Sequence, residues 1–316
     1  MVTLVTGGAG FIGSHLVESL SKLNEEIIVL DNFSIGFYNL PFLRKLRNVT
    51  IIEGDITNLD IVDEVVSNCS KIFHLAAMNR APRSIENPIK SNETNITGTL
   101  YILEAARKHD IDGIVFASSS SVYGRSDELP RKENGKTWPS HPYAVGKLAS
   151  EHYCDVFNYL YGLKVKILRY FAVYGPRQSS KVKYAAVIPI FIKNIIEGRP
   201  LTVFGNGTQT RNFTFVKDNI KATIAAMESD RATARILNIA SETEVSLNQI
   251  IQYLEEITGR TIEVNYGNWR HGDIIRSPAD TKLATEILGI EAETSVMEGL
   301  TLTYNWNLEN PYYFDV

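Results

Sequence analysis

The chain has 316 residues, of which 44% are hydrophobic and 22% charged, and its formal net charge is −4. These values are typical of a globular protein with a substantial core, and they argue against a nucleic-acid partner, since no Lys/Arg-dense stripe is present. Two cysteines and six scattered histidines predict neither a disulfide framework nor a metal site. Without a signal-like N-terminus or a run of about 18 apolar residues, we expect a cytoplasmic protein with no membrane segment.

The first predicted elements are a strand, a tight turn and the start of a helix. Residues 2–5 form a short apolar run, and Gly7, Gly8, Gly10 and Gly13 follow it. Glycine permits unusual backbone angles and lets a ligand approach the main chain closely. The free N–H groups at the start of a helix favour a diphosphate. The turn therefore predicts dinucleotide binding, although a glycine-rich turn that binds nothing is the alternative.

The second predicted strand covers Glu26 to Leu30 and ends in Asp31. An acidic residue about 20 positions after the glycines belongs to the dinucleotide-binding pattern. A carboxylate at this place can accept both ribose hydroxyls and repels a 2′-phosphate. Asp31 therefore favours NAD over NADP, unless it is merely a solvated residue that closes the strand.

Strands and helices continue to alternate up to about residue 175. The predicted strands are 49–53, 72–77, 114–117 and 165–170, and the predicted helices are 61–66, 92–108 and 143–161. This alternation predicts an α/β fold with a doubly wound parallel sheet. Ligands of such sheets bind beyond the carboxyl ends of the strands. At those ends stand the glycine turn, Asp31, Asp55, Ala76, Ser119 and Tyr170.

The remaining chain is expected to form a smaller, mixed α+β lobe. Its predicted elements are a helix over 188–196, strands over 201–204, 237–240 and 262–264, and a helix that starts at Val216. We expect residues 1–175 to form the NAD-binding domain and residues 176–316 mainly the substrate lobe, with some later segments returning to the first domain.

Three residue types point to chemistry. Tyr143 and Lys147 are four apart, which puts them on one face of the predicted helix. A tyrosine normally titrates at about 10. A nearby ammonium and a positively charged nicotinamide would lower that pKa and make Tyr143 a general base. Ser118 to Ser121 place four hydroxyls at the end of a buried strand, where one can bond the reacting oxygen. The alternatives are chance spacing and a turn that caps the strand.

These motifs occur in the order seen in the extended short-chain dehydrogenase/reductase family, which the chain resembles over nearly its whole length. The shared motifs are TGGAGFIG, Asp31-Asn32, Gly54-Asp55-Ile56, HLAA, SSSSVYG, Tyr143-x-x-x-Lys147, RYFAVYGPRQ, GNGTQTRNFTFVKD and RHGDIIRSPAD. Within that family the chain is most similar to nucleotide-sugar 4-epimerases. The segments PRSIENPIKSNETNITGTL and YAAVIP resemble those of bacterial UDP-N-acetylglucosamine 4-epimerases.

The resemblance implies a role for each matching position. Tyr143 would take the proton from the sugar 4-hydroxyl beside Ser119, and Lys147 would hold the ribose of NAD. Hydride would pass from sugar C4 to NAD and return to the other face of a 4-keto sugar. The implied NAD contacts are Gly7, Gly10, Phe11, Ile12, Gly13, Asp31, Asn32, Asp55, Ile56, Leu75, Ala76, Ala77, Asn95, Ser118, Tyr143, Lys147 and Tyr170.

The same resemblance implies a UDP-sugar site. Arg211 matches the arginine that binds the diphosphate, and Arg270 with Asp273 matches the pair at the phosphate and uridine ribose. The implied substrate contacts are Arg80, Ser119, Ser120, Tyr143, Ala172, Ala186, Val187, Thr202, Val203, Phe204, Arg211, Arg270, Asp273 and Ser277.

Five positions depart from related patterns or bear on substrate choice. Ser120 and Ser121 replace the acidic residues of 4,6-dehydratases and decarboxylases, which argues against those reactions. Ala172 replaces the usual asparagine, so one contact to substrate is missing. Arg80 stands where a small or apolar residue is usual, and it is either solvated or able to reach a sugar carboxylate. Ser277 aligns with a position where tyrosine restricts sugar size, which predicts room for a 2-N-acetyl group.

We therefore expect an NAD-dependent isomerase that interconverts UDP-glucose with UDP-galactose, and UDP-GlcNAc with UDP-GalNAc. Arg80 and Arg83 keep a UDP-glucuronate 4-epimerase open as an alternative. A catalytically silent binding protein is the alternative from another class. By analogy with the family, we expect a homodimer packed through the helices over 92–108 and 143–161.

Overall fold

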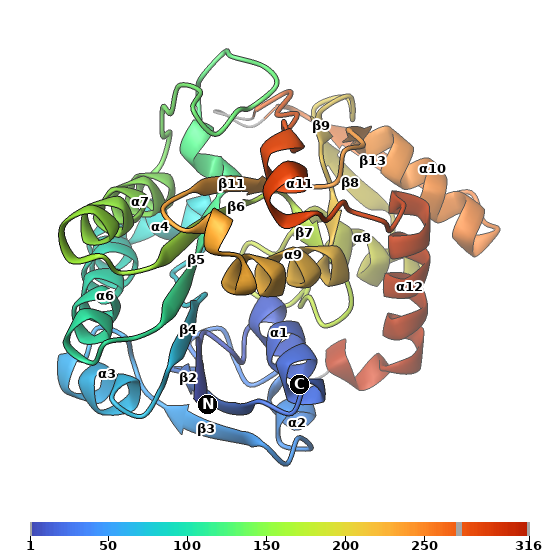
Figure 1. Ribbon diagram of the computed structural model, residues 1–316. Coiled ribbons are helices and arrows are strands. Elements are labelled where there is room, and N and C mark those ends of the chain that lie inside the picture. Colours follow the sequence, from blue (N-terminus) through green and yellow to red (C-terminus); the bar gives the residue numbers. More distant parts are fainter. Residues whose placement is uncertain (1, 270–273, 315–316) are drawn as a thin grey trace.

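The core of the protein is a seven-stranded parallel sheet with the order β11-β6-β5-β4-β1-β2-β3. In the computed structural model, residues 2–269 and 274–314 are described. The strands of this sheet are β1 (Val2–Thr6), β2 (Glu26–Asp31), β3 (Val49–Glu53), β4 (Lys71–His74), β5 (Gly113–Ser119), β6 (Val165–Tyr170) and β11 (Ile236–Ile239). Figure 1 shows helices on both sides of this sheet, as the alternating pattern predicts.

The two faces of the sheet bury different sets of side chains. Val5 packs in one cluster with Leu16 of helix α1 (Phe11–Lys22) and residues of α9 (Val216–Glu228). Leu4 packs in a second cluster with residues of α3 (Leu59–Val66), α6 (Gly98–Lys108) and α7 (Pro142–Tyr161). Successive residues of a strand point to opposite faces, so one apolar run supplies both cores.

The predicted strand 72–77 and helix 92–108 differ from the observed elements. β4 ends at His74, so residues 75–77 leave the sheet and line the cavity described below. The helix is divided into α5 (Pro88–Asn92), a π-helical turn (Glu93–Thr97) and α6. A π turn inside a helix often accompanies a functional site. Here the turn carries Asn95, whose amide bonds both backbone groups of Met78, at 2.8 and 3.2 Å.

The later part of the chain builds three small sheets and contributes one strand to the large one. β11 joins the large sheet beside β6, with Ile236 opposite Ile167. The small sheets pair β7 (Val173–Tyr174) with β10 (Thr214–Phe215), β9 (Thr210–Arg211) with β12 (Val245–Ser246), and β8 (Leu201–Phe204) with β13 (Val264–Gly267). The other α-helices are α2 (Leu40–Leu43), α4 (Ala81–Glu86), α8 (Val187–Ile196), α10 (Leu247–Thr258), α11 (Lys282–Leu288) and α12 (Val296–Glu309).

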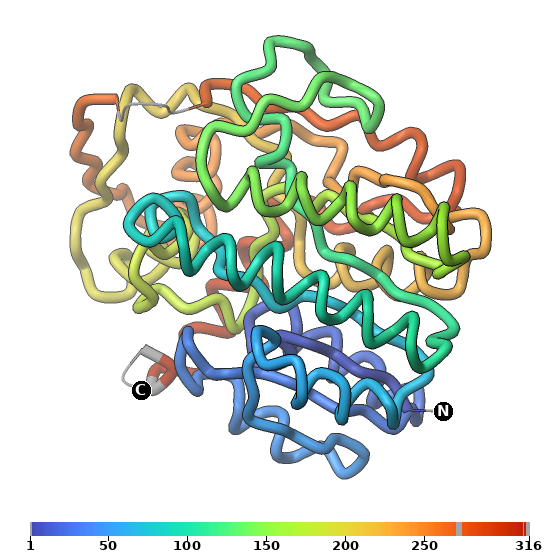
Figure 2. Tube along the Cα trace, turned by 90° about the vertical axis from the view of Figure 1, so that its left-hand side faces the viewer, coloured from blue at the N-terminus to red at the C-terminus, as the bar shows by residue number. Residues whose placement is uncertain are grey.

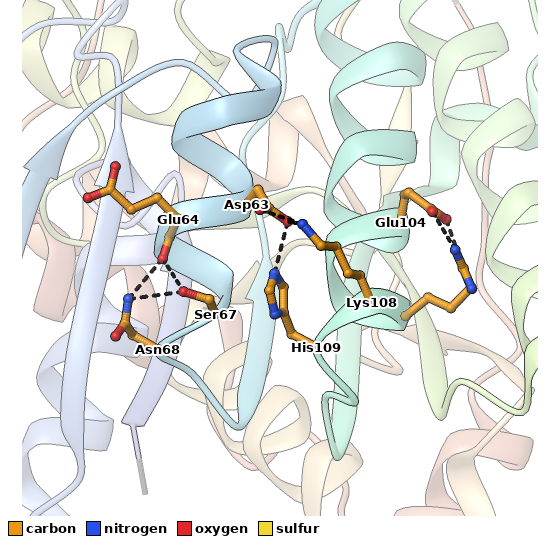
Figure 3. A network of polar contacts seen from close by, with 8 residues as sticks. Asp63, Glu64, Ser67, Asn68, Glu104, Lys108 and His109 are labelled. Carbon is orange, nitrogen blue, oxygen red and sulfur yellow. Dashed lines mark hydrogen bonds and ion pairs between the residues drawn. The ribbon is translucent and has the colours of Figure 1, made fainter.

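Polar contacts join α3 to the end of α6 at the surface (Figure 3). The Asp63 carboxylate accepts hydrogen bonds from Lys108 Nζ at 2.7 and 2.9 Å, and His109 Nε2 lies 2.8 Å from it. Lys108 is exposed, and Asp63 and His109 are half-buried at the surface, so we expect each pair to contribute little to stability. Within residues 2–269 and 274–314, no helix is long and apolar enough to cross a membrane.

Gly13 packs directly against the glycine turn, and this contact gives a first prediction. A Cβ at this position would lie 2.2 Å from the Gly7 carbonyl oxygen and 2.7 Å from the Gly8 Cα. Gly13→Ala is therefore expected to lower the free energy of unfolding by about 1–3 kcal/mol, measured by urea denaturation.

Gly267→Ala is the matched control, because its Cβ would meet no atom closer than 3.7 Å. Equal stability losses in the two variants would contradict the explanation by close packing.

Candidate active site

A cavity of about 1000 Å³ lies at the carboxyl ends of the sheet strands. Its walls come from the glycine turn, the ends of β2, β4 and β5, the start of α7, and β8 of the smaller lobe. This is where parallel α/β sheets bind ligands. The volume is at the upper end of the usual range for ligand pockets, so the cavity is large enough for extended ligands.

The glycine turn has the geometry of a dinucleotide cradle. Gly7 adopts a φ of +69°, and its N–H donates to the Leu30 carbonyl at 2.8 Å. A Cβ on Gly7 would lie 2.7 Å from the Ala76 backbone nitrogen. Gly10 precedes α1 without a side-chain cap, which leaves N–H groups of the first turn for a ligand. These residues fit the diphosphate of NAD.

Asp31 holds the glycine turn and the following loop together. Its carboxylate accepts from the Ala9 N–H at 3.0 Å and from the Phe33 N–H at 2.9 Å. Burial raises the pKa of Asp31, and these two bonds act in the opposite direction. Each carboxylate oxygen keeps a second lone pair, so Asp31 can still accept from ribose hydroxyls.

Ser119 and Tyr143 come from β5 and α7 and meet in the cavity. Burial raises the pKa of Tyr143, while hydrogen bonding to Ser119 and the charge of Arg80 lower it. His141, which caps the start of α7, stacks on the Tyr143 ring with centroids 6.0 Å apart. The base predicted from the sequence therefore lies beside a hydroxyl and a guanidinium.

The sequence predicts that the Lys147 ammonium lowers the pKa of Tyr143, but in the structure this ammonium is bonded elsewhere. Its Nζ donates to the Ala117 carbonyl at 2.7 Å, and burial lowers its pKa to about 8. The charge that lowers the Tyr143 pKa comes from Arg80 instead. The physical reason is position: Lys147 follows Tyr143 by one helical turn, and its ammonium is bonded to the end of β5.

Behind these residues, Glu151 of α7 forms a buried ion pair with β6 and a hydrogen bond with β5. Arg169 of β6 donates to the two oxygens of Glu151 at 2.9 and 2.6 Å, and both side chains are 2% exposed. The Ser118 hydroxyl also donates to Glu151. Glu151 lies on α7 two turns after Tyr143, so the pair connects Ser118, next to Ser119, with the helix that carries the base.

Most of the predicted site residues line this one cavity. They are Gly7, Gly10, Phe11, Ile12, Gly13, Asp31, Asn32, Ile56, Leu75, Ala76, Ala77, Arg80, Ser118, Ser119, Ser120, Tyr143, Lys147, Tyr170, Ala172, Ala186, Val187, Thr202, Val203, Phe204 and Arg211.

Five predicted residues are not placed on the cavity wall. Asp55 lies next to it and accepts from Asn32 Nδ2 at 2.8 Å. Asn95 does not line the cavity itself but accepts a hydrogen bond from the N–H of Met78, which does. Ser277 is buried and is not part of the cavity wall. Arg270 and Asp273 lie outside the described residues.

Arg211 reaches the cavity with much of its guanidinium bonded to backbone. Its two terminal nitrogens donate at 2.6 Å to the carbonyls of Thr210 and Ile274. These bonds anchor the segment that follows residue 273 to β9.

Among the cavity residues that were not selected from the sequence are Gln178, His141 and Tyr313. Gln178 is 8% exposed, and its Oε1 has no hydrogen-bond partner within the described residues. It belongs to the motif RYFAVYGPRQ, which provided a signal for it. Tyr313 had no such signal, because only the folded chain brings its C-terminal turn to the cavity.

Comparison with known proteins identifies the family. The profile of the NAD dependent epimerase/dehydratase family matches residues 3–240. A UDP-glucuronate 4-epimerase of Thermodesulfobacterium geofontis is 34% identical over 316 residues, covering 97% of this chain and 96% of the relative. The chain belongs to the NAD dependent epimerase/dehydratase family.

Solved structures show the same fold. UDP-glucose 4-epimerase from Thermotoga maritima, crystallised with UDP-glucose, superposes with a TM-score of 0.93 at 35% identity, covering 98% of this chain and 100% of that chain. UDP-N-acetylglucosamine 4-epimerase from Methanobrevibacter ruminantium, in complex with UDP-N-acetylmuramic acid, gives 0.92 at 35% identity, covering 98% of each chain.

Proposed function

We propose that the protein is an NAD-dependent UDP-sugar 4-epimerase acting on UDP-hexoses and UDP-N-acetylhexosamines. The observation that carries the proposal is the meeting of Ser119 and Tyr143 in the cavity that the glycine turn also lines. The 4-epimerases among the relatives and solved structures support it. In this proposal residues 1–175 supply most of the NAD site, and residues 176–316 supply most of the sugar-nucleotide site.

Each site residue has a defined task in the reaction. NAD, when bound on the glycine turn and Asp31, supplies the acceptor and donor of hydride for sugar C4. Tyr143 takes the proton of the sugar 4-hydroxyl and later returns it, and the Ser119 hydroxyl bonds the same oxygen. Lys147 lies near the end of β5, where it can hold the ribose beside the nicotinamide.

The cavity wall favours epimerisation over elimination of a hydroxyl. Among the described lining residues, Asp31 is the one carboxylate, and it lies at the glycine turn. Ser121 donates to Ser119 Oγ at 2.9 Å where a dehydratase would carry an acid. No described acid is therefore placed beside the base to protonate a leaving group.

Incubation with UDP-glucose, UDP-GlcNAc and UDP-glucuronate, with products identified by NMR, tests the proposal. We expect a C4 epimer from at least one neutral sugar nucleotide and no net change of NAD. The absence of a C4 epimer from all three substrates would disprove the epimerase assignment.

Arg80 favours a second candidate, a 4-epimerase of UDP-hexuronates. Arg80 is half-buried on the cavity wall beside Tyr143, and its side chain forms no hydrogen bond or ion pair with a described residue. Its φ of +77° is unusual for a residue with a side chain. A carboxylate is a natural partner for such a guanidinium.

Arg80→Ser separates the two candidates. If Arg80 binds a sugar carboxylate, kcat/KM for UDP-glucuronate falls by about 10- to 100-fold, because a hydrogen bond to a charged group is lost. The kcat/KM for UDP-GlcNAc, measured in parallel, should fall by a smaller factor, because that substrate loses only the effect of the Arg80 charge on the pKa of Tyr143. Equal losses on the acidic and neutral substrates would exclude the carboxylate role.

We also propose that the protein forms a homodimer through two neighbouring helical segments, residues 88–108 and α7. Figure 2 shows these segments side by side across one face of the molecule. α7 exposes Val145, Val156, Tyr159 and Leu160 along its length, and Ile89 of α5 is 72% exposed. Apolar side chains gathered on one face are typical of an interface. Light scattering coupled to size-exclusion chromatography measures the state directly, and a monomer at micromolar concentration would contradict the proposal.

A further inference from the structure

The C-terminal turn of the chain, Pro311–Phe314, returns to the cofactor side of the molecule. Figure 1 shows the chain after α12 descending toward α1 and α2, away from the smaller lobe. Tyr313 in this turn is 7% exposed and lines the large cavity. This turn is therefore packed into the cofactor side of the molecule and contributes a side chain to the cavity wall.

The Tyr313 hydroxyl joins two loops of the cavity wall. It lies 2.5 Å from the Arg177 carbonyl oxygen and 3.1 Å from Asn39 Oδ1. Asn39 Nδ2 in turn donates to the carbonyl of Ala9, inside the glycine turn, at 3.3 Å. One hydroxyl therefore connects the loop after β7, the loop after β2 and the glycine turn itself.

Aromatic packing fixes the Tyr313 ring in this place. The ring meets Trp306 of α12 edge-on, with centroids 5.0 Å apart, and lies 6.0 Å from Tyr38. Trp306 also lies 6.0 Å from Phe42 of α2. These rings, contributed by α12 and by the segment from Tyr38 to α2, hold the hydroxyl against its partners.

The loop at Arg177 is anchored on α1 as well. The Arg177 guanidinium lies 2.5 Å from Glu18 and 2.7 Å from His15 Nδ1, and His15 Nε2 lies 2.8 Å from the Pro176 carbonyl. Burial, helped by the Arg177 charge, lowers the pKa of His15 to about 3. The ring is therefore neutral, accepts from Arg177 and donates to Pro176. Gln178, the next residue, faces the cavity.

We propose that Tyr313 is a positioning residue for the cofactor, and that the C-terminal turn latches the loops that enclose NAD. This inference rests on one part of the proposed function, namely that NAD binds at the glycine-turn side of the cavity. When the hydroxyl is absent, the Arg177 carbonyl and Asn39 lose a buried partner, and the loop over residues 32–39 can open. The latch therefore controls how fast NAD leaves.

Tyr313→Phe tests the latch. The probe is NAD itself, preloaded and displaced by an excess of etheno-NAD, with the fluorescence change giving the dissociation rate. We expect dissociation to be about three- to tenfold faster than in wild type, because one buried hydrogen bond is lost. At saturating NAD, kcat measured on the same preparation is expected to change less than the dissociation rate, which separates cofactor loss from a slower chemical step.

Tyr266→Phe is the matched control, since Tyr266 lies on β13, is 56% exposed, and its hydroxyl lies 3.2 Å from Asn248 Oδ1. It should leave NAD dissociation at the wild-type rate. An unchanged rate in Tyr313→Phe, or an equal acceleration in both variants, would overturn the latch. If the wild-type protein epimerises its substrate but Tyr313→Phe releases NAD at the wild-type rate, this inference alone is refuted. If the wild-type protein does not bind NAD, the proposed function is refuted.

Discussion

Replacing Tyr143 by phenylalanine is expected to lower kcat by about 10²- to 10⁴-fold, the usual contribution of a positioned acid or base. The hydroxyl that Ser119 and Arg80 face is lost, while the ring that stacks on His141 is kept. NAD binding should survive, because the glycine turn and Asp31 are untouched. Initial rates of sugar interconversion by NMR, together with the amount of NAD bound, measure both effects.

Tyr153→Phe provides the control on the same helix. Tyr153 is 38% exposed and does not line the cavity, so its loss should leave kcat at the wild-type value. If Tyr143→Phe retained more than roughly a tenth of wild-type kcat, another group would have to be the base.

Removing the Glu151 carboxylate by Glu151→Ala is expected to cost about 3–5 kcal/mol of unfolding free energy. The reason is that Arg169, 2% exposed, would be left as a buried charge without its partner. Ser118 would lose the acceptor that holds the end of β5 against α7. Urea denaturation measures the stability loss, and kcat should fall as well because Ser119 and Tyr143 would no longer be held together.

Glu104→Ala is the matched comparison, because Glu104 forms an exposed ion pair with Arg107 at 2.6 Å. Exposed pairs contribute about 0–1 kcal/mol, so this variant should remain close to wild type. The double variant Glu151→Met with Arg169→Met should recover much of the lost stability, since no charge remains buried. A Glu151→Ala loss no larger than that of Glu104→Ala would show that the buried pair does not stabilise the fold.

The parallel sheet and much of the cavity wall were predictable because their signals are local. The strand over 165–170 matches β6, and the apolar run before Gly7 matches β1. Strand direction then places Asp31 and Ser119 at one edge of the sheet. Local periodicity could not show that the predicted strand 72–77 ends at His74, nor that a π turn interrupts the predicted helix at Asn95. The loop after β4 and the π turn are joined by the hydrogen bond from the Met78 N–H to Asn95 Oδ1, a contact between segments that local periodicity does not describe.

The surroundings of the predicted catalytic side chains depend on contacts between distant segments. Spacing alone placed Lys147 beside Tyr143, but burial and the Ala117 carbonyl direct its ammonium elsewhere. Arg80 reaches Tyr143 from a loop more than 60 positions earlier in the chain.

The amino-acid sequence by itself determined the class of fold and the glycine turn, indicated NAD as the cofactor, and predicted the Ser119–Tyr143–Lys147 set. These follow from backbone periodicity, glycine conformation and fixed spacing, which are properties of short segments. Only the tertiary structure decided that Arg80 lies beside Tyr143, that Glu151 joins Ser118 of β5 and Arg169 of β6 to α7, and that the Tyr313 hydroxyl is connected to the glycine turn through Asn39. Those contacts join residues far apart in the chain, and their energies depend on burial, which only the folded protein creates.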